Sequence, residues 1–586
     1  MIIGRPSSRE YHLHGANGFS TQVDGPTLTR LTGVSFGMGL ATRGAGGRMD
    51  AGSDAVITAS LSGLEIVRPL DGDDGVPAGR RSAATGSPAR AAAAPEAATS
   101  QAAVDELGGK VKKGLGWSFL NNVISRAGVL IIGIALARML APDEFGVFAV
   151  ALLAMQLLMS LNDAGMTSAL IRWQGDIEEV ERTGVTMIFC FSSLLYGVFF
   201  VTAPVFAAAL HIPEASSVLR LLALTIIIDA TAAVPTALLT RSFSQGKRTI
   251  ADTSSLVVWA GLSIGLTAAG FGVWALVWGR LIGNLVTALV IFALAPRRPR
   301  PGFDPVLARR LAADGLPLTG SGFLTFCMIN VDTAVTGRIL GPIALGYYTM
   351  AFNLASWPVN MFSFAVRRVS LVGFAQLSAE PSRLRFVYAR SLALLTAVTV
   401  PVCVLLATLG EEVIETVYGT KWVLADQALR FLALLSIVRV AIEITDDLLV
   451  ALGKARIMVR IQTLWLVALI PALTIGAHLD GIRGVAIGHL VVAVGIVAPA
   501  FCLTLRALGF PLVRIAMILV RPALGGIAFA LVTRVGPWVA SPPPVQLLVG
   551  AVAAIAVYAV FVAPMRWLVR QRRDGQPRPS ESHESW

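Results

Sequence analysis

Hydrophobic residues in this chain are gathered into long segments, and short polar connections separate one segment from the next. Each segment is close to the roughly 20 residues that an α-helix needs to cross the hydrocarbon core of a membrane. Fourteen of them, with ends defined to within a few residues, run over 116–137, 145–165, 183–204, 218–240, 251–270, 272–294, 315–337, 345–365, 388–409, 427–449, 456–476, 484–505, 515–535 and 545–565. This pattern predicts an all-α membrane protein with about 14 transmembrane helices.

One of the connections is repeated. The stretch 138–151 returns 200 positions later as 338–351, without a gap. The two copies share five identities, which are Arg138 with Arg338, Leu140 with Leu340, Pro142 with Pro342, Gly146 with Gly346 and Ala151 with Ala351. A turn repeated at this distance inside a hydrophobic chain indicates a duplicated bundle. We therefore predict two six-helix lobes followed by two C-terminal helices, and membrane proteins built in this way usually move a solute between their halves.

Basic residues divide the connections into two kinds. With the N-terminus placed in the cytoplasm, the inner connections carry most of the lysines and arginines. The outer connections hold little beyond Arg138, Arg338, Lys421, Arg483 and Arg534. Because basic residues stay on the cytoplasmic side, this bias predicts cytoplasmic N- and C-termini in the inner membrane. Both copies of the repeated turn then lie outside, so the lobes form a parallel repeat about an axis along the membrane normal.

The same reading predicts the domain boundaries. Residues 1–105 are rich in Gly, Ala, Ser and Arg, and they form either a disordered tail or an extension from a misplaced start codon. The remaining parts are an N-lobe with spans 1–6 (106–295), a basic cytoplasmic linker (296–314), a C-lobe with spans 7–12 (315–506), spans 13–14 (507–565) and a cytoplasmic tail (566–586). Within the linker, 306–313 is expected to lie as an amphipathic helix on the anionic inner leaflet.

Composition and motifs exclude several classes of protein. Of the 586 residues, 55% are hydrophobic and only 14% are charged, against roughly a quarter charged in soluble domains. The net charge of +12 is spread over short connections, which argues against a nucleic-acid partner. The 4 cysteines and 6 histidines are scattered, so we predict no metal and no cofactor. The sequence contains no GxxxxGK[ST], HExxH or GxSxG motif, which argues against an enzyme.

Polar residues within the apolar segments mark the candidate site, because polar groups at membrane depth usually face a cavity or a partner. The candidate substrate-binding residues are Arg126, Asn122, Arg280, Asn284, Asp332, Arg430 and Arg439. The candidate coupling acids are Asp229, Asp332 and Glu443. Among the arginines, Arg126 is the strongest candidate, because it lies near mid-span and has no acidic residue in its own helix.

These residues also admit structural interpretations. Arg439 and Glu443 are four positions apart on a helix and can neutralise each other. Arg280 can bridge to Asp229 or Asp332 as a purely structural contact. Several arginines around a central space favour an anionic cargo, since a guanidinium group binds phosphate through two hydrogen bonds. Exposed carboxylates in the same space would instead favour a cation exporter.

Five segments resemble a known family. They read GLGWSF at 114–119, ARMLAPDEFGVF at 137–148, DAG at 163–165, DTAVTGRILGPIALGYY at 332–348 and LGKAR at 452–456. The chain resembles, over about 110–565, the polysaccharide or O-antigen flippases of the lipopolysaccharide and colanic-acid translocase type. These belong to the multidrug/oligosaccharidyl-lipid/polysaccharide exporter superfamily.

The resemblance implies two six-helix lobes that alternate between inward and outward openings. It also implies an undecaprenyl-diphosphate-linked oligosaccharide as cargo, with Arg126 as the candidate contact to the diphosphate. The implied partners are this lipid-linked cargo, membrane lipid and the polymerase and chain-length proteins of the same pathway. Two alternatives stay open, a cation-coupled multidrug exporter of the same superfamily and a membrane glycan polymerase or ligase. The latter would use outer carboxylates such as Glu411, Glu412 and Glu415.

Overall fold

The computed structural model describes residues 10–14, 20–24 and 128–563, except for 163–166, 168–169, 171–172, 174–176, 243, 296, 298–299 and 536–542. For the two strands and for 245, 314–319, 321, 362–369, 371–372, 534–535, 543–544 and 546–547 it describes the backbone alone. The chain divides into two compact units, Met1–Ala92 and Ala93–Trp586. In the first unit, β1 (Glu10–His14) pairs antiparallel with β2 (Ser20–Asp24), so that Glu10 lies opposite Asp24.

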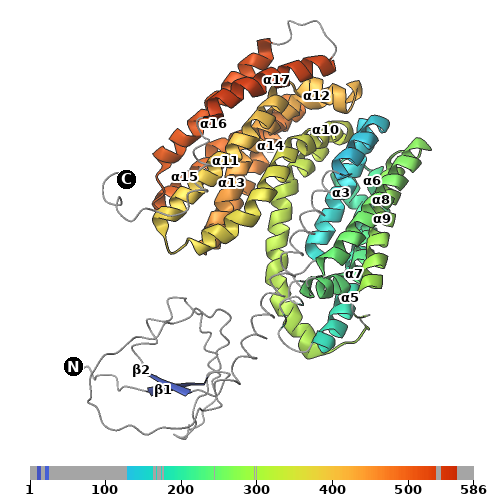
Figure 1. Ribbon diagram of the computed structural model, residues 1–586. Helices are drawn as coiled ribbons and strands as arrows, with labels where there is room; N and C mark the ends of the chain where they lie inside the picture. The colour runs from blue at the N-terminus through green and yellow to red at the C-terminus, as the bar shows by residue number, and fades with distance from the viewer. Residues whose placement is uncertain are drawn as a thin grey trace, which may run out of the picture. The chain divides into compact units, whose positions relative to one another are not determined.

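Every regular element that the structure describes in the second unit is a helix (Figure 1). A short apolar helix, Gly128–Met139, comes first. The others are α3 (Pro142–Asn162), α5 (Ile177–Ala209), α6 (Ala215–Ala223), α7 (Thr225–Arg241), α8 (Gln245–Ala268), α9 (Val273–Leu294), α10 (Pro305–Gln376), α11 (Pro381–Thr408), α12 (Gly410–Val417), η2 (Thr420–Ala425), α13 (Asp426–Ala451), α14 (Ala455–Val492), η3 (Ala493–Val497), α15 (Ala498–Ala507), α16 (Leu512–Val535) and α17 (Pro543–Val562).

These helices confirm the predicted all-helical, multi-pass class. Within the described part of the chain, 9 helices are long and apolar enough to cross a membrane. The predicted segment 116–137 is described only from residue 128, where it is helical. The tight connection between α8 and α9 runs through Gly270 and Gly272, whose φ angles are +83° and +54°. Glycine is suited to this turn because it adopts positive φ without a steric penalty.

Helix α10 consists of two helices that meet at a kink, and the predicted spans 315–337 and 345–365 lie on either side of it. It begins at Pro305 and includes the end of the predicted linker together with two predicted spans. The side chain of Asp304 caps it by accepting hydrogen bonds from the amides of Val306 (2.7 Å) and Leu307 (3.3 Å). Proline at the first helical position is also favourable, because the amide it lacks would have no partner there. A single residue, Gly341, leaves the helical region, with φ +81° and ψ −176°.

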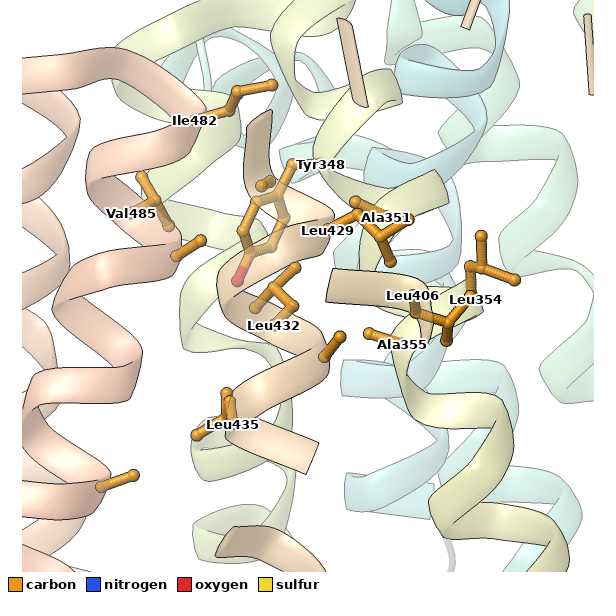
Figure 2. Packing of buried hydrophobic residues seen from close by; sticks show 14 of the residues in the cluster. Tyr348, Ala351, Leu354, Ala355, Leu406, Leu429, Leu432, Leu435, Ile482 and Val485 are labelled. Atoms are coloured by element: carbon orange, nitrogen blue, oxygen red, sulfur yellow. The ribbon is translucent and has the colours of Figure 1, made fainter. Parts of the chain in front are cut away.

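The largest hydrophobic cluster joins helices from separate parts of the chain. Figure 2 shows Tyr348 and Ala351 of α10, Leu432 of α13 and Val485 of α14 among its members. Trp422 of η2 is fully buried in the same cluster. Lipid tails are as apolar as these side chains, so close van der Waals packing stabilises the cluster more than the exclusion of water does.

The two copies of the repeated turn pack directly against each other, where α3 lies beside α10 (Figure 1). A Cβ atom on Gly146 would lie 1.8 Å from the carbonyl oxygen of Pro342. Reciprocally, a Cβ atom on Gly346 would lie 2.0 Å from the carbonyl oxygen of Pro142. Only glycine allows backbones to approach this closely. The conserved spacing of the repeat therefore produces a symmetric contact between its copies.

Candidate functional site

A buried carboxylate lies on α10. Asp332 is 1% exposed. It accepts a hydrogen bond from the hydroxyl of Tyr348 at 3.0 Å and another from the backbone amide of Thr333 at 2.7 Å. Tyr348 is itself fully buried and belongs to the second copy of the repeat. Since a buried charge is costly without partners, these contacts and the nearby guanidinium of Arg439 hold Asp332 in place.

Arg439 projects from α13 into the same region. It donates to the hydroxyl of Ser356 at 3.2 Å, and its guanidinium carbon lies 5.3 Å from the centre of the Phe352 ring. It also acts electrostatically on His489 of α14, whose ring lies 6.2 Å from that of Trp465. Arg439 and Glu443, which could neutralise each other on the same helix, form no ion pair among the described side chains. Arg439 is half-buried, and Ser356 accepts from only one of the five N–H groups of its guanidinium.

A second candidate arginine, Arg280, lies on α9, which packs against α7. Arg280 interacts electrostatically with Asp229, as the sequence suggested, although the two side chains form no ion pair within 4.0 Å among those described. Its Nε is buried and has no hydrogen-bond partner among the described residues. Asn284 lies one turn further along α9 and is half-buried. A buried donor without a protein partner is suited to a ligand or to water.

The remaining candidates are placed differently. Arg430 donates from Nε to the Oδ2 of Asp426 at 2.5 Å, and its guanidinium lies 3.9 Å from Glu411. These contacts tie it to the start of α13 rather than to the buried groups around Arg439. Glu443 is half-buried on α13. Arg126 and Asn122 lie outside the described residues.

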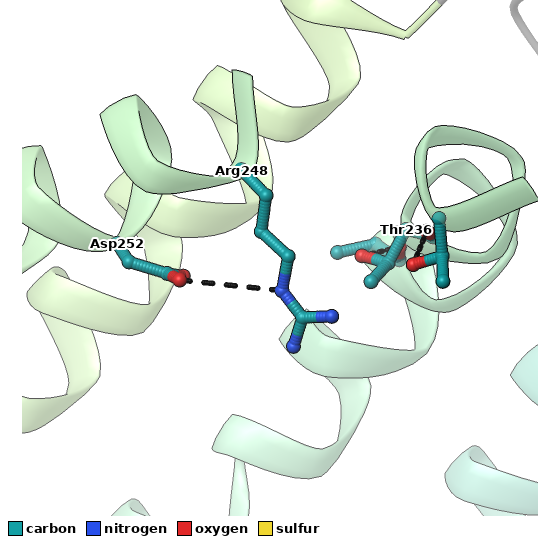
Figure 3. Close-up of polar contacts among 5 residues, drawn as sticks. Thr236, Arg248 and Asp252 are labelled. Carbon is teal, nitrogen blue, oxygen red and sulfur yellow. Dashed lines mark hydrogen bonds and ion pairs between the residues drawn. The ribbon is translucent and has the colours of Figure 1, made fainter. Parts of the chain in front are cut away.

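Basic residues mark the end of the helices opposite the repeated turns. Arg297 pairs with Glu178 at 2.8 Å, and the Nζ of Lys247 donates to the carbonyl of Leu294 at 3.2 Å. Arg248 approaches Asp252 at 4.0 Å, one turn along α8 (Figure 3). A polar cavity of about 140 Å³ lies here, lined by Glu178, Glu181, Arg182, Arg297 and Arg300. The ion pairs at this end are exposed, so they contribute little to stability.

At the end that carries the repeated turns, Lys421 and Trp422 of η2 contact residues 137–140. The Nζ of Lys421 donates to the carbonyls of Arg138 (3.0 Å) and Leu140 (2.6 Å). The Nε1 of Trp422 donates to the carbonyl of Ala137 at 2.7 Å. Partial burial lowers the pKa of Lys421, and the carboxylate of Glu144 opposes this shift. Burial also raises the pKa of Tyr418, beside this segment, to about 12.

Sequence reasoning did not identify several of these partners. Tyr348 and Ser356 lie beyond the kink at Gly341 from Asp332, and Trp465 and His489 lie on either side of the kink in α14. Helical spacing does not extend across a kink or from one helix to another, so no spacing rule could join these residues. The one available signal was the position of Tyr348 inside the repeat.

The fold defines the class of protein. The structure resembles the lipid II flippase MurJ in an inward closed conformation, with a TM-score of 0.66, covering 78% of this chain and 100% of that one at 15% identity. It also resembles an inward-facing MATE multidrug resistance transporter of the MOP superfamily, with a TM-score of 0.52, covering 65% and 95% at 17% identity. At such identities the likeness is one of fold, and it is the fold of membrane transporters.

The sequence is similar to that of polysaccharide biosynthesis proteins. A family model described as polysaccharide biosynthesis protein matches residues 135–426. The chain is 26% identical to the succinoglycan biosynthesis transport protein ExoT of Rhizobium meliloti, over 80% of this chain and 97% of the relative. It is 24% identical to the lipopolysaccharide biosynthesis protein WzxC of Escherichia coli, over 66% and 79%. The chain therefore resembles polysaccharide biosynthesis proteins that are transporters rather than enzymes, which agrees with the predicted resemblance. Its long apolar helices are those of a multi-pass membrane protein.

Proposed function

We propose that this transporter flips an undecaprenyl-diphosphate-linked oligosaccharide from the inner to the outer leaflet, for the biosynthesis of O-antigen, capsule or exopolysaccharide. Similarity to a polysaccharide transport protein along almost that relative's whole length carries this proposal. The fold of a lipid II flippase supports it, because that protein also handles a lipid-linked substrate.

The proposed architecture has 14 spans in the inner membrane, with both termini cytoplasmic. An N-lobe (106–295) and a C-lobe (315–506) are joined by the linker 296–314 and followed by spans 13–14 (507–565), with an extension (1–105) and a tail (566–586) at the two ends. The reciprocal contact of Gly146 with Pro342 and of Gly346 with Pro142 supports the paired lobes. Transport then proceeds by alternating access, as the lobes rock about this contact.

The substrate-binding residues in this proposal are Arg280, Asn284 and Arg439, together with Arg126 and Asn122. A diphosphate is strongly disfavoured in a low-dielectric interior unless cations and hydrogen-bond donors replace its water. The buried Nε of Arg280 and the half-buried guanidinium of Arg439 supply such donors. The lipid tail stays in the bilayer while the sugar passes between the lobes.

Asp332 is proposed as the principal coupling acid, with Asp229 and Glu443 as secondary candidates. A buried carboxylate can gain or lose a proton or a cation as its surroundings change. Asp332 is suited to this role because it lies on α10, which also carries the second copy of the repeat. The polymerase and chain-length proteins of the same pathway are the proposed partners, since they would receive the flipped product.

A flipping assay tests the function. The purified protein is reconstituted in liposomes with a fluorescent undecaprenyl-diphosphate oligosaccharide in the outer leaflet, and a membrane-impermeant quencher reports what remains there. Protein-dependent loss of quenchable lipid is the expected result. If quenching does not differ from that of empty liposomes, while a cationic dye is transported across the same membrane, the multidrug exporter is the correct assignment.

A further inference from the structure

We propose that Arg138 and Arg338 form a paired latch that closes the outer end of the transport path, and that both must release before cargo can leave. The inference rests on the proposed function and on its topology, in which both repeated turns face outward. It adds two gating residues to the binding residues described above.

Arg138 reaches from the N-lobe to the C-lobe. Its Nε donates to the carbonyl of Val417 at 2.8 Å, and one terminal nitrogen donates to the carbonyl of Thr416 at 2.6 Å. Thr416 and Val417 are the last two residues of α12. Carbonyls in the last turn of a helix have no partner within the helix and carry the negative end of its dipole. A guanidinium group therefore satisfies two of them and complements their charge.

Arg338 makes the equivalent contact in the opposite direction. Its guanidinium donates to the carbonyl of Ala209, the last residue of α5 in the N-lobe. The backbone carbonyl of Arg338 in turn lies 2.8 Å from the Nδ1 of His211. Each copy of the repeat thus sends its arginine to the C-terminal end of a helix in the other lobe. This symmetry explains why arginine occurs at both positions of an otherwise diverged repeat.

The position of these contacts is suited to a gate. Both arginine side chains are exposed, so water can replace the helix carbonyls when the contact opens. The crossing at Gly146 and Gly346 belongs to the same repeated segments as the two arginines, and there each glycine meets a proline carbonyl of the other copy. We infer that the glycine crossing is the pivot and that the two arginines set how far the outer end stays closed.

A distance measurement without cargo tests the latch. In a variant whose four native cysteines are replaced, spin labels are attached through Glu214→Cys, in the N-lobe between α5 and α6, and Leu424→Cys, in η2 of the C-lobe. Both positions are exposed and lie at the end that carries the repeated turns. Pulsed electron paramagnetic resonance then gives the distribution of distances between the lobes in detergent and in liposomes.

Arg138→Gln and Arg338→Gln should each move the distribution toward longer distances, and the double variant should increase the ratio of open to closed molecules by about tenfold. Arg220→Gln is the matched control. Its Nε also donates to a helix carbonyl, that of Phe200 at 3.0 Å, but both residues lie in the N-lobe. The control should leave the distribution unchanged.

Two results would overturn the latch: an unaltered distribution in the double variant that remains monodisperse, or the same shift in the Arg220→Gln control. Because no cargo is present, this outcome is separate from the flipping assay. A shifted distribution in a protein that does not flip lipid-linked oligosaccharide would refute the proposed function and leave the latch standing. Flipping together with an unaltered distribution would refute the latch alone.

Discussion

At the scale of single residues, the most informative group is the carboxylate of Asp332. Asp332 is buried away from water. Apart from its neighbour Thr333, the described residue whose side chain donates a hydrogen bond to it is Tyr348. Losing a donor to a buried charge costs more than losing a donor between two neutral groups, because the charge remains desolvated. This difference can be measured by deleting one hydroxyl.

Tyr348→Phe should lower the free energy of unfolding by about 1–3 kcal/mol, because it leaves the Asp332 carboxylate with one donor fewer. Tyr388→Phe is the control, since Tyr388 is also buried but its hydroxyl lies 2.8 Å from that of Thr445, a neutral partner. The control should lose about 0.5–1.5 kcal/mol. Thermal unfolding in detergent, compared with the unaltered protein, measures both. Equal losses in the two variants would contradict a charged Asp332.

A second residue-scale prediction separates two arginines of α13. Arg439→Gln should slow flipping by about 10- to 100-fold, because a hydrogen bond to a charged group contributes about 1.5–3 kcal/mol. Arg430→Gln should slow it less than about twofold, because Arg430 is already bound by Asp426 and Glu411. The liposome assay measures both rates at equal protein content. An Arg430→Gln variant as slow as Arg439→Gln would make Arg430 a substrate-binding residue, as the sequence predicted.

At the scale of helices, the crossing of α3 and α10 depends on two glycines. Gly146→Ala and Gly346→Ala each place a methyl group within 2.0 Å of a proline carbonyl, so the helices must separate. We expect each to cost about 1–3 kcal/mol of stability, as overpacking does elsewhere, with a lower yield of folded protein. Gly133→Ala is the control, because a Cβ there meets nothing within 4 Å. A melting temperature unchanged in Gly146→Ala would show that the crossing is looser than described.

The helix boundaries show which breaks the hydrophobicity pattern of the sequence can predict. The apolar segments located the helices, and the amphipathic helix expected at 306–313 lies at the start of α10, which the structure begins at Pro305. In α10 the predicted division between 315–337 and 345–365 coincides with the kink at Gly341. The same holds in α14, where the kink at Asp480 and Gly481 lies between the predicted spans 456–476 and 484–505. The hydrophobicity pattern therefore located both breaks, although each involves only one or two non-helical residues.

At the scale of the whole molecule, the proposed orientation can be tested directly. With the native cysteines replaced, Leu424→Cys should react with a membrane-impermeant maleimide on intact cells. Phe303→Cys, which is 64% exposed at the opposite end of the helices, should react only after the membrane is opened. The positive-inside rule predicts this order because the basic residues gather at the end that carries Phe303. The reverse order of labelling would show that the chain is inserted in the opposite orientation.

The sequence by itself determined that this chain is an all-helical membrane protein, where its helices lie, and that one turn is duplicated. These properties follow from local hydrophobicity and identity, which the linear order of residues records. Only the tertiary structure decided that the copies of the turn touch through Gly146 and Gly346, and that Arg138 and Arg338 cross to the opposite half. It also decided that Arg430 pairs with Asp426 and Glu411, whereas Arg439 forms no ion pair with any side chain that the structure describes. Such contacts join residues up to 279 positions apart. Their energy depends on distances between helices, which the spacing of residues along one helix does not determine.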